Sequence, residues 1–155
     1  MEKKMLYHGS NVVVEKPKIL INGFYKDFGY GFYCTNIDKQ ARRWAITKKG
    51  DSFVNKYSYT EDKEFKKVVF QKMTEEWLQF VVDCRRGIEH DYDVVEGPMA
   101  DDQIWDYVEE YVAGNISKAA FWELSKFRYP THQIVFCTEK SLKSLHFEGS
   151  VLVAK

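Results

Sequence analysis

Apolar and polar residues follow two different periods along the chain, and the changes of period predict short strands separated by helices. Alternation over residues 52–60 predicts a strand, and the apolar run within 65–71 predicts a second strand that pairs with it as a hairpin. Apolar residues spaced three or four apart predict helices over 74–87, 101–114 and 117–127. Strands interleaved with helices, several of the strands antiparallel, indicate an α+β fold.

Polar residues and glycines mark where these elements begin and end. Thr35 is followed three residues later by Asp38, which is the spacing of a capping box at the start of a helix. Thr74 precedes two acidic residues and predicts the start of the next helix, which Gly87 ends. The remaining expected elements are an opening strand that ends at residue 10, strands over 32–35, 93–96, 132–137 and 147–153, and a helix over 138–145.

The segment FGYGFYCTNIDKQARRW, residues 28–44, joins a glycine-hinged aromatic strand to a helix. Gly29 and Gly31 allow the chain to bend sharply and allow a flat ligand to lie close to the main chain. The strand and the helix together are expected to bring Tyr33 near Trp44. The alternative that needs no ligand is a β-α unit with an aromatic core.

The composition is typical of one ordered globular domain over residues 1–155. The chain is 45% hydrophobic and 30% charged, with a formal net charge of zero, which gives no electrostatic case for non-specific nucleic-acid binding. No apolar run is long enough to span a membrane and no signal peptide is evident, so a cytoplasmic location is expected. The three cysteines and four histidines lack the spacing of metal ligands, and the cysteines are expected to be buried free thiols.

Four short motifs occur in a fixed order: YHGS at 7–10, DFGYGFYCT at 27–35, GPMADD at 97–102 and QIVF at 133–136. Together they resemble the ADP-ribosyltransferase superfamily, in particular its poly(ADP-ribose) polymerase and diphtheria-toxin branch. A small bacterial group of uncharacterised domains with YHGS, DFGxGFYxT, GPxADD and QIxF motifs is more similar still. The resemblance covers nearly the whole chain and implies a split, mixed and antiparallel β-sheet with a nucleotide cleft and flanking helices.

The resemblance also implies an activity. Members of the superfamily use NAD as a co-substrate, without a metal, and transfer its ADP-ribose part to a macromolecular acceptor that is a protein or a nucleic acid. Some small bacterial members are toxins, so a neutralising antitoxin is an expected partner. Two alternatives remain open: an inactive module that binds NAD or ADP-ribose, and an NAD glycohydrolase.

The motifs carry the family's site residues over to this chain. By the resemblance, His8 bonds a ribose hydroxyl, while the backbone of Gly9 and the hydroxyl of Ser10 hold the nicotinamide carboxamide. Tyr33 and Trp44 supply aromatic faces for the flat, cationic nicotinamide ring. The polymerases carry a further serine three residues before the second aromatic residue, where this chain has Ala41.

The late strand departs from the family pattern, because Gln133 stands where the family has its catalytic acid. A glutamine accepts a hydrogen bond from the ribose but adds no charge to stabilise an oxocarbenium-like transition state. On this basis Gln133→Glu is expected to keep binding and to raise turnover.

A carboxylate could instead come from the GPMADD motif and its flanks. The candidates are Glu96, Asp101 and Asp102, for which the alternative roles are an exposed strand end and helix caps. Arg85 is a candidate for binding pyrophosphate, with pairing to surface acids as the alternative.

Overall fold

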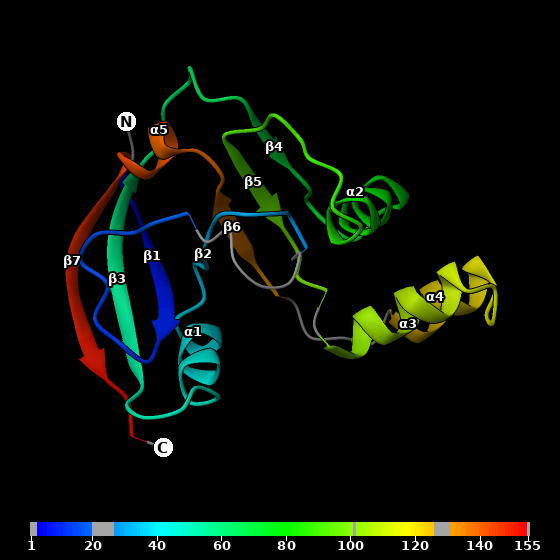
Figure 1. Cartoon of the computed structure of the whole chain (residues 1–155), viewed down its shortest axis with the longest axis horizontal. Coiled ribbons are helices and arrows are strands. Elements are labelled where there is room, and N and C mark those ends of the chain that lie inside the picture. The colour runs from blue at the N-terminus through cyan, green and yellow to red at the C-terminus, as the bar shows by residue number, and fades with distance from the viewer. Residues whose placement is uncertain (1–2, 20–26, 101, 126–130, 155) are drawn as a thin grey trace.

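The computed structural model describes residues 3–19, 27–100, 102–125 and 131–154, whose strands form two sheets (Figure 1). The first sheet is antiparallel, in the order β1 (Lys3–Ser10), β3 (Phe53–Thr60) and β7 (Leu145–Leu152). The second sheet has the order β2 (Phe32–Cys34), β6 (Gln133–Phe136), β5 (Val94–Gly97) and β4 (Lys67–Val69). Only its β4–β5 pair is parallel. One antiparallel and one mixed sheet with accompanying helices confirm the α+β class.

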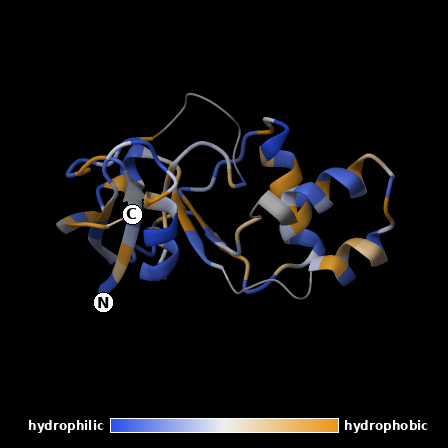
Figure 2. Ribbon diagram, turned by 90° about the horizontal axis from the view of Figure 1, so that it is seen from below, coloured by the Kyte–Doolittle hydropathy of each residue, from blue (hydrophilic) through white to orange (hydrophobic). Residues whose placement is uncertain are grey.

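The helices are distributed unevenly around the two sheets. They are α1 (Asp38–Ala45), α2 (Glu75–Arg85), α3 (Asp102–Val112), α4 (Lys118–Ser125) and the short α5 (Glu139–Leu142). Helix α1 packs against β1 and β3 of the first sheet. Helices α2, α3 and α4 gather at the end of the molecule away from the N and C termini, as Figure 2 shows.

A bridge between Tyr7 and Thr35 joins the edges of the two sheets. The Tyr7 N–H donates to the Thr35 carbonyl at 2.8 Å, and the Thr35 N–H donates back to the Tyr7 carbonyl at 2.9 Å. Because this bridge lies between β1 and the residue that follows β2, it brings the YHGS motif beside the aromatic strand of the DFGYGFYCT motif.

Buried side chains form two clusters on opposite faces of the second sheet. The helix-side cluster joins Tyr33, Val95 and Val135 of this sheet to apolar residues of α2, α3 and α4, among them Trp77, Val81, Ile104, Val108 and Phe121. The inter-sheet cluster joins Phe32, Cys34, Val94, Ile134 and Phe136 to Leu6, Tyr57 and Tyr59 of the first sheet. Successive residues of β2, β5 and β6 therefore alternate between the two clusters, as the strand repeat requires.

The predicted hairpin between 52–60 and 65–71 is wrong. Both strands form, but β3 lies in the first sheet and β4 in the second, where β4 pairs with β5 in parallel. Alternation of apolar and polar residues determines which side chains are buried, but it carries no information about the partner strand.

The predicted capping box of the first helix is also wrong. The N-cap of α1 is Ile37, and no side chain caps it. The Thr35 hydroxyl accepts from the Ile37 N–H at 3.1 Å, and Asp38 pairs with Arg42 at 3.0 Å instead. The prediction failed because Thr35 belongs to the bridge between the sheets. By contrast, Thr74 caps α2 as expected, accepting from the Trp77 N–H at 3.2 Å.

Candidate functional site

The YHGS motif ends β1 against the aromatic strand. Nδ1 of His8 lies 2.6 Å from the Tyr33 carbonyl oxygen, and the His8 ring stacks on Phe32 with 4.3 Å between ring centroids. A carbonyl only accepts, so Nδ1 carries a proton and donates it. Strand β2 therefore sets the orientation of the His8 ring through the Tyr33 carbonyl and the Phe32 ring.

Gly9 lies directly beneath helix α1. A Cβ atom built on Gly9 would stand 2.3 Å from the Ala41 carbonyl oxygen, 2.9 Å from the Ala45 nitrogen and 3.2 Å from the Trp44 Cβ. The absence of a side chain thus lets α1 pack directly on β1, and it places Trp44 beside the motif. Next to Gly9, the Ser10 hydroxyl accepts from the Val12 N–H at 3.3 Å.

Tyr33 is buried, with 8% of its surface exposed. Its hydroxyl donates to the Gly29 carbonyl at 2.6 Å and accepts from the Phe28 N–H at 3.1 Å, which closes the tight loop that precedes β2. Gly29 has a φ of 84°, an angle that favours glycine. Burial is the main reason that the pKa of Tyr33 lies well above its usual value, so the hydroxyl stays protonated. Half-buried Trp44 packs against the same helix-side cluster.

Gln133 opens β6 on the face that carries Tyr33 and Val135, because residues two apart on a strand share a face. Its side chain is buried and meets an aspartate that the sequence reasoning missed. Nε2 of Gln133 donates to Asp27 Oδ2 at 3.2 Å and to the Pro98 carbonyl at 3.5 Å. The first residue of β6 is thus an amide that contacts a buried carboxylate.

Asp27 lies at the centre of a network formed entirely by hydrogen-bond donors. Arg85 donates to Asp27 Oδ1 from Nε at 2.8 Å and from Nη2, and the Ala100 N–H donates to Oδ2 at 2.6 Å. Burial is the largest influence on Asp27 and raises its pKa, while Arg85, Ala100 and Gln133 act in the opposite direction. Four donors with no competing acceptor match the lone pairs of an ionised carboxylate.

Arg85 therefore pairs with the buried Asp27 and not with an acid on the surface. The guanidinium also lies over the Trp105 ring, 4.1 Å from its centroid. A pyrophosphate would have to compete with a buried carboxylate for this side chain, so the structure favours the ion pair over the phosphate-binding role. Asp101 lies outside the described residues, and the structure describes only the backbone of Asp102, at the start of α3.

Glu96 lies on the other face of the second sheet. It lies two residues after Val94, which belongs to the inter-sheet cluster, so the two side chains share a face of the sheet. Glu96 also pairs in register with Ile134 of the same cluster. Glu96 accepts from His132 Nε2 at 2.7 Å and lies 3.2 Å from Lys67 Nζ. Burial alone would raise the pKa of Glu96, but His132 and Lys67 outweigh it and lower the value to about 2. The geometry therefore separates Glu96 from Gln133.

The ion pairs of Glu96 predict a pH-dependent contribution to stability. A pKa of about 2 in the folded state, against the ordinary 4.5, corresponds to about 3 kcal/mol. This stability is fully present above about pH 4.5 and is lost as the pH falls towards 2. Glu96→Gln is therefore expected to lower the free energy of unfolding by about 2 to 3 kcal/mol at pH 7 and by much less at pH 2.5. Urea unfolding at both pH values measures this difference.

Glu61→Gln is the matched control, because Glu61 pairs with the same lysine from an exposed position. A change of at most about 1 kcal/mol is expected there. A loss in Glu96→Gln that is equally large at pH 7 and pH 2.5 would contradict the ionic explanation.

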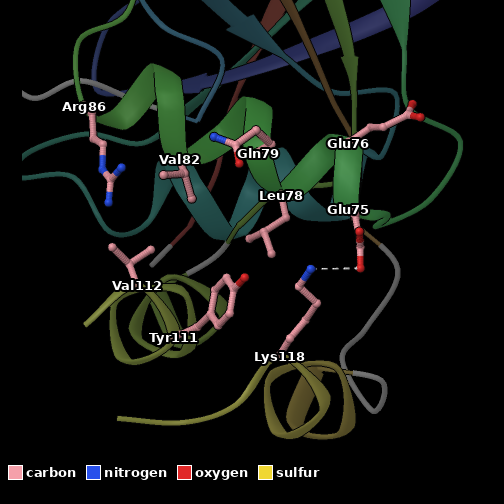
Figure 3. A pocket seen from close by; sticks show the side chains of 9 residues that line it. All are labelled: Glu75, Glu76, Leu78, Gln79, Val82, Arg86, Tyr111, Val112 and Lys118. Atoms are coloured by element: carbon pink, nitrogen blue, oxygen red, sulfur yellow. Dashed lines mark ion pairs between the residues drawn. The ribbon is translucent and has the colours of Figure 1, made fainter. Parts of the chain in front are cut away.

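Two cavities are found among the described residues. One of about 540 Å³ separates α2 from the α3–α4 pair, with Leu78, Val82 and Tyr111 in its wall and a Glu75–Lys118 ion pair of 3.2 Å at its edge (Figure 3). The other, of about 290 Å³, is lined in part by Gly29, Cys84, His90, Tyr92 and Cys137. Neither is lined by His8, Gly9, Ser10, Trp44 or Gln133.

Sequence reasoning missed Asp27, which contacts Gln133, and His132, which pairs with Glu96 on the other face of the sheet, for different reasons. Asp27 precedes the FGYGFY strand within a quoted motif, and a charged residue next to a buried aromatic strand was the available signal. His132 had no such signal, because its partners, Glu96 and the Asn36 N–H, are distant in sequence. In the part of the chain that the structure describes, no group of three or more histidine, cysteine or acidic residues could hold a metal ion.

The fold and the site define an α+β protein with two sheets and a buried Asp27–Arg85–Gln133 network at the start of a central strand. A comparison with sequence families matches residues 4–147 to the family described as "Protein of unknown function (DUF3990)". The chain belongs to this family. No curated protein and no solved structure matches the chain. None of the helices in the described residues has the length and apolar character needed to cross a membrane.

Proposed function

We propose that the protein is an ADP-ribosyltransferase that uses NAD as co-substrate and modifies a macromolecular acceptor, a protein or a nucleic acid. The observation that carries the proposal is the proximity of three motifs that lie far apart in sequence. His8 contacts the backbone of Tyr33, and Gln133 shares a sheet face with Tyr33. Trp44 stands beside Gly9 and packs on the cluster that contains Tyr33.

The proposed reaction needs little covalent chemistry from the protein. The bond between the nicotinamide nitrogen and ribose C1′ breaks with its electron pair leaving on nicotinamide, and the ribose gains oxocarbenium character. A nucleophilic atom of the acceptor then bonds to C1′ and releases its proton to solvent. The side chains of His8 and Gln133 would hold the ribose hydroxyls. Tyr33 and Trp44 would flank the nicotinamide ring.

Purified protein incubated with NAD labelled in its adenylate part tests the proposal. In the presence of lysate, label is expected on protein or nucleic acid together with one released nicotinamide per label transferred. Nuclease and protease treatment of the product separates the two acceptor classes. Neither label nor nicotinamide, in lysates from several sources, would refute the transferase. A toxin role, with a neutralising partner, predicts that expression arrests growth and that His8→Ala relieves the arrest.

A second candidate is a binding module that has lost the chemistry. The observation that favours it is that Gln133 carries no charge and that the nearby Asp27 is already paired with Arg85. Calorimetry with intact NAD distinguishes the two candidates. Binding without nicotinamide release supports the module, nicotinamide release with acceptor labelling supports the transferase, and release without an acceptor supports a glycohydrolase.

Trp44→Ala should weaken NAD binding by about 1 to 3 kcal/mol, because the variant loses one aromatic face for the cationic ring. The matched control is Trp122→Ala, since Trp122 also packs partly buried on the helix-side cluster but lies on α4. Both variants are expected to lose stability, and only the first to lose affinity. Calorimetry and thermal melting on both proteins measure this. Unchanged affinity in folded Trp44→Ala would remove Trp44 from the site.

A further inference from the structure

We propose that Asp27 is a positioning residue that orients the Gln133 amide, and that this carboxylate–amide pair takes the place of the single acid of the resembled superfamily. The inference rests on the proposed function, because it assigns a role within that site. Its basis is the geometry of the network around Asp27, which determines the direction in which each group of the Gln133 amide points.

The orientation of the Gln133 amide follows from its two neighbours. Asp27 Oδ2, at 3.2 Å, and the Pro98 carbonyl oxygen, at 3.5 Å, are both acceptors. Only the NH₂ group of the amide can satisfy them, so Oε1 must point away from both. Gln133 is 2% exposed, and among the described residues none donates a hydrogen bond to Oε1. A ligand hydroxyl that reaches this buried position would therefore find Oε1 as the acceptor of the amide.

Asp27 is itself held rigidly from three sides. Arg85 binds Oδ1 and is in turn held against the Trp105 ring, while the Ala100 N–H binds Oδ2. Since Oδ2 also receives the Gln133 NH₂ group, the carboxylate connects α2, the segment after β5 and the start of β6 through a single side chain. A charge-assisted donor contact of this kind also polarises the amide and makes Oε1 a stronger acceptor.

The same contact explains why residue 133 is a glutamine. A glutamate there would place a second carboxylate beside Asp27 Oδ2 and the Pro98 carbonyl, where only a donor fits. The negative charge that the superfamily has on its late strand is therefore supplied in this chain by a second side chain, which contacts the late strand. Asp27 carries the charge, and Gln133 carries the oxygen that faces the ribose hydroxyl.

A double-mutant cycle on nicotinamide release tests this role. Asp27→Asn is expected to lower the single-turnover rate by roughly 10- to 100-fold while the Kd for NAD changes less than about threefold, since orientation matters most in the transition state. Gln133→Ala should lower the rate at least as much. In the double variant the loss should equal that of Gln133→Ala, because Asp27 then has no amide to orient. Multiplicative losses, or an Asp27→Asn protein with the wild-type rate, would overturn the inference.

The exchange variant Asp27→Asn/Gln133→Glu covers the case in which Asp27→Asn does not fold. It keeps one amide and one carboxylate in contact at these two positions. It is expected to fold and to release nicotinamide, whereas a folded exchange variant without release would overturn the inference. The two proposals fail in different ways. Wild-type protein that neither binds nor cleaves NAD refutes both, and an active wild type with an additive cycle refutes only the role of Asp27.

Discussion

Asp27→Ala is expected to lower the free energy of unfolding by about 3 to 5 kcal/mol, which is the usual effect of removing one partner from a buried ion pair. The substitution leaves the Arg85 guanidinium charged beside apolar side chains, and it leaves the Ala100 N–H and the Gln133 NH₂ group without their acceptor. Each of these groups then loses a bond without regaining full hydration. Urea unfolding at pH 7, monitored by circular dichroism and by tryptophan fluorescence, measures the change.

Asp38→Ala provides the matched control for Asp27→Ala. Asp38 also pairs with an arginine, Arg42, at 3.0 Å, but both side chains are more than 40% exposed. An exposed pair of this kind contributes at most about 1 kcal/mol. Similar losses in the two alanine variants would mean that the Asp27 network does not stabilise the fold more than a surface ion pair does.

Several elements of the fold could be predicted because the information lies within a short stretch of sequence. Helix α2 begins at Thr74 with a side-chain cap, and its buried residues recur at helical spacing. Strand β2 follows from its run of aromatic residues. The partner of each strand could not be predicted, because pairing depends on contacts such as the Tyr7–Thr35 bridge between distant residues. For the same reason β4 was assigned to the wrong sheet.

The candidate site could likewise be predicted only in part, for the same reason. Motif order was enough to select His8, Gly9, Tyr33 and Gln133, and the structure brings the first three to one edge where β1 meets β2. Motif order could not reveal that the Gln133 amide contacts Asp27. The partner of its amide, Asp27, is 106 positions away. A charged residue next to a buried aromatic strand indicates a buried acid, but a linear pattern does not show which distant side chains it contacts. Glu96 was a candidate carboxylate for the same site, but strand alternation places it on the opposite face of the sheet.

Gln133→Glu shows how the structure changes an expectation drawn from sequence. The sequence predicts that a carboxylate at this position keeps binding and raises turnover, because the superfamily has an acid there. The structure puts Asp27 Oδ2 at 3.2 Å from the atom that would become a carboxylate oxygen. Two carboxylates at this distance in a buried site cannot both be ionised without a large cost, so one of them takes up a proton. We therefore expect Gln133→Glu to fold less stably by about 2 to 4 kcal/mol at pH 7 and to lose turnover.

The pH dependence of Gln133→Glu separates charge repulsion from a simple misfit. The shared proton gives the folded variant a raised pKa, so the folded state binds more protons than the unfolded state, and its stability falls as the pH rises. The stability deficit relative to wild type should thus be smallest near pH 4 and should grow towards pH 8. Adding Asp27→Asn removes one of the two charges and should abolish most of this pH-dependent part. Urea unfolding of the three proteins between pH 4 and pH 8 measures both effects. A deficit that is constant with pH, or one that Asp27→Asn does not relieve, would show that the two side chains do not meet as the structure describes.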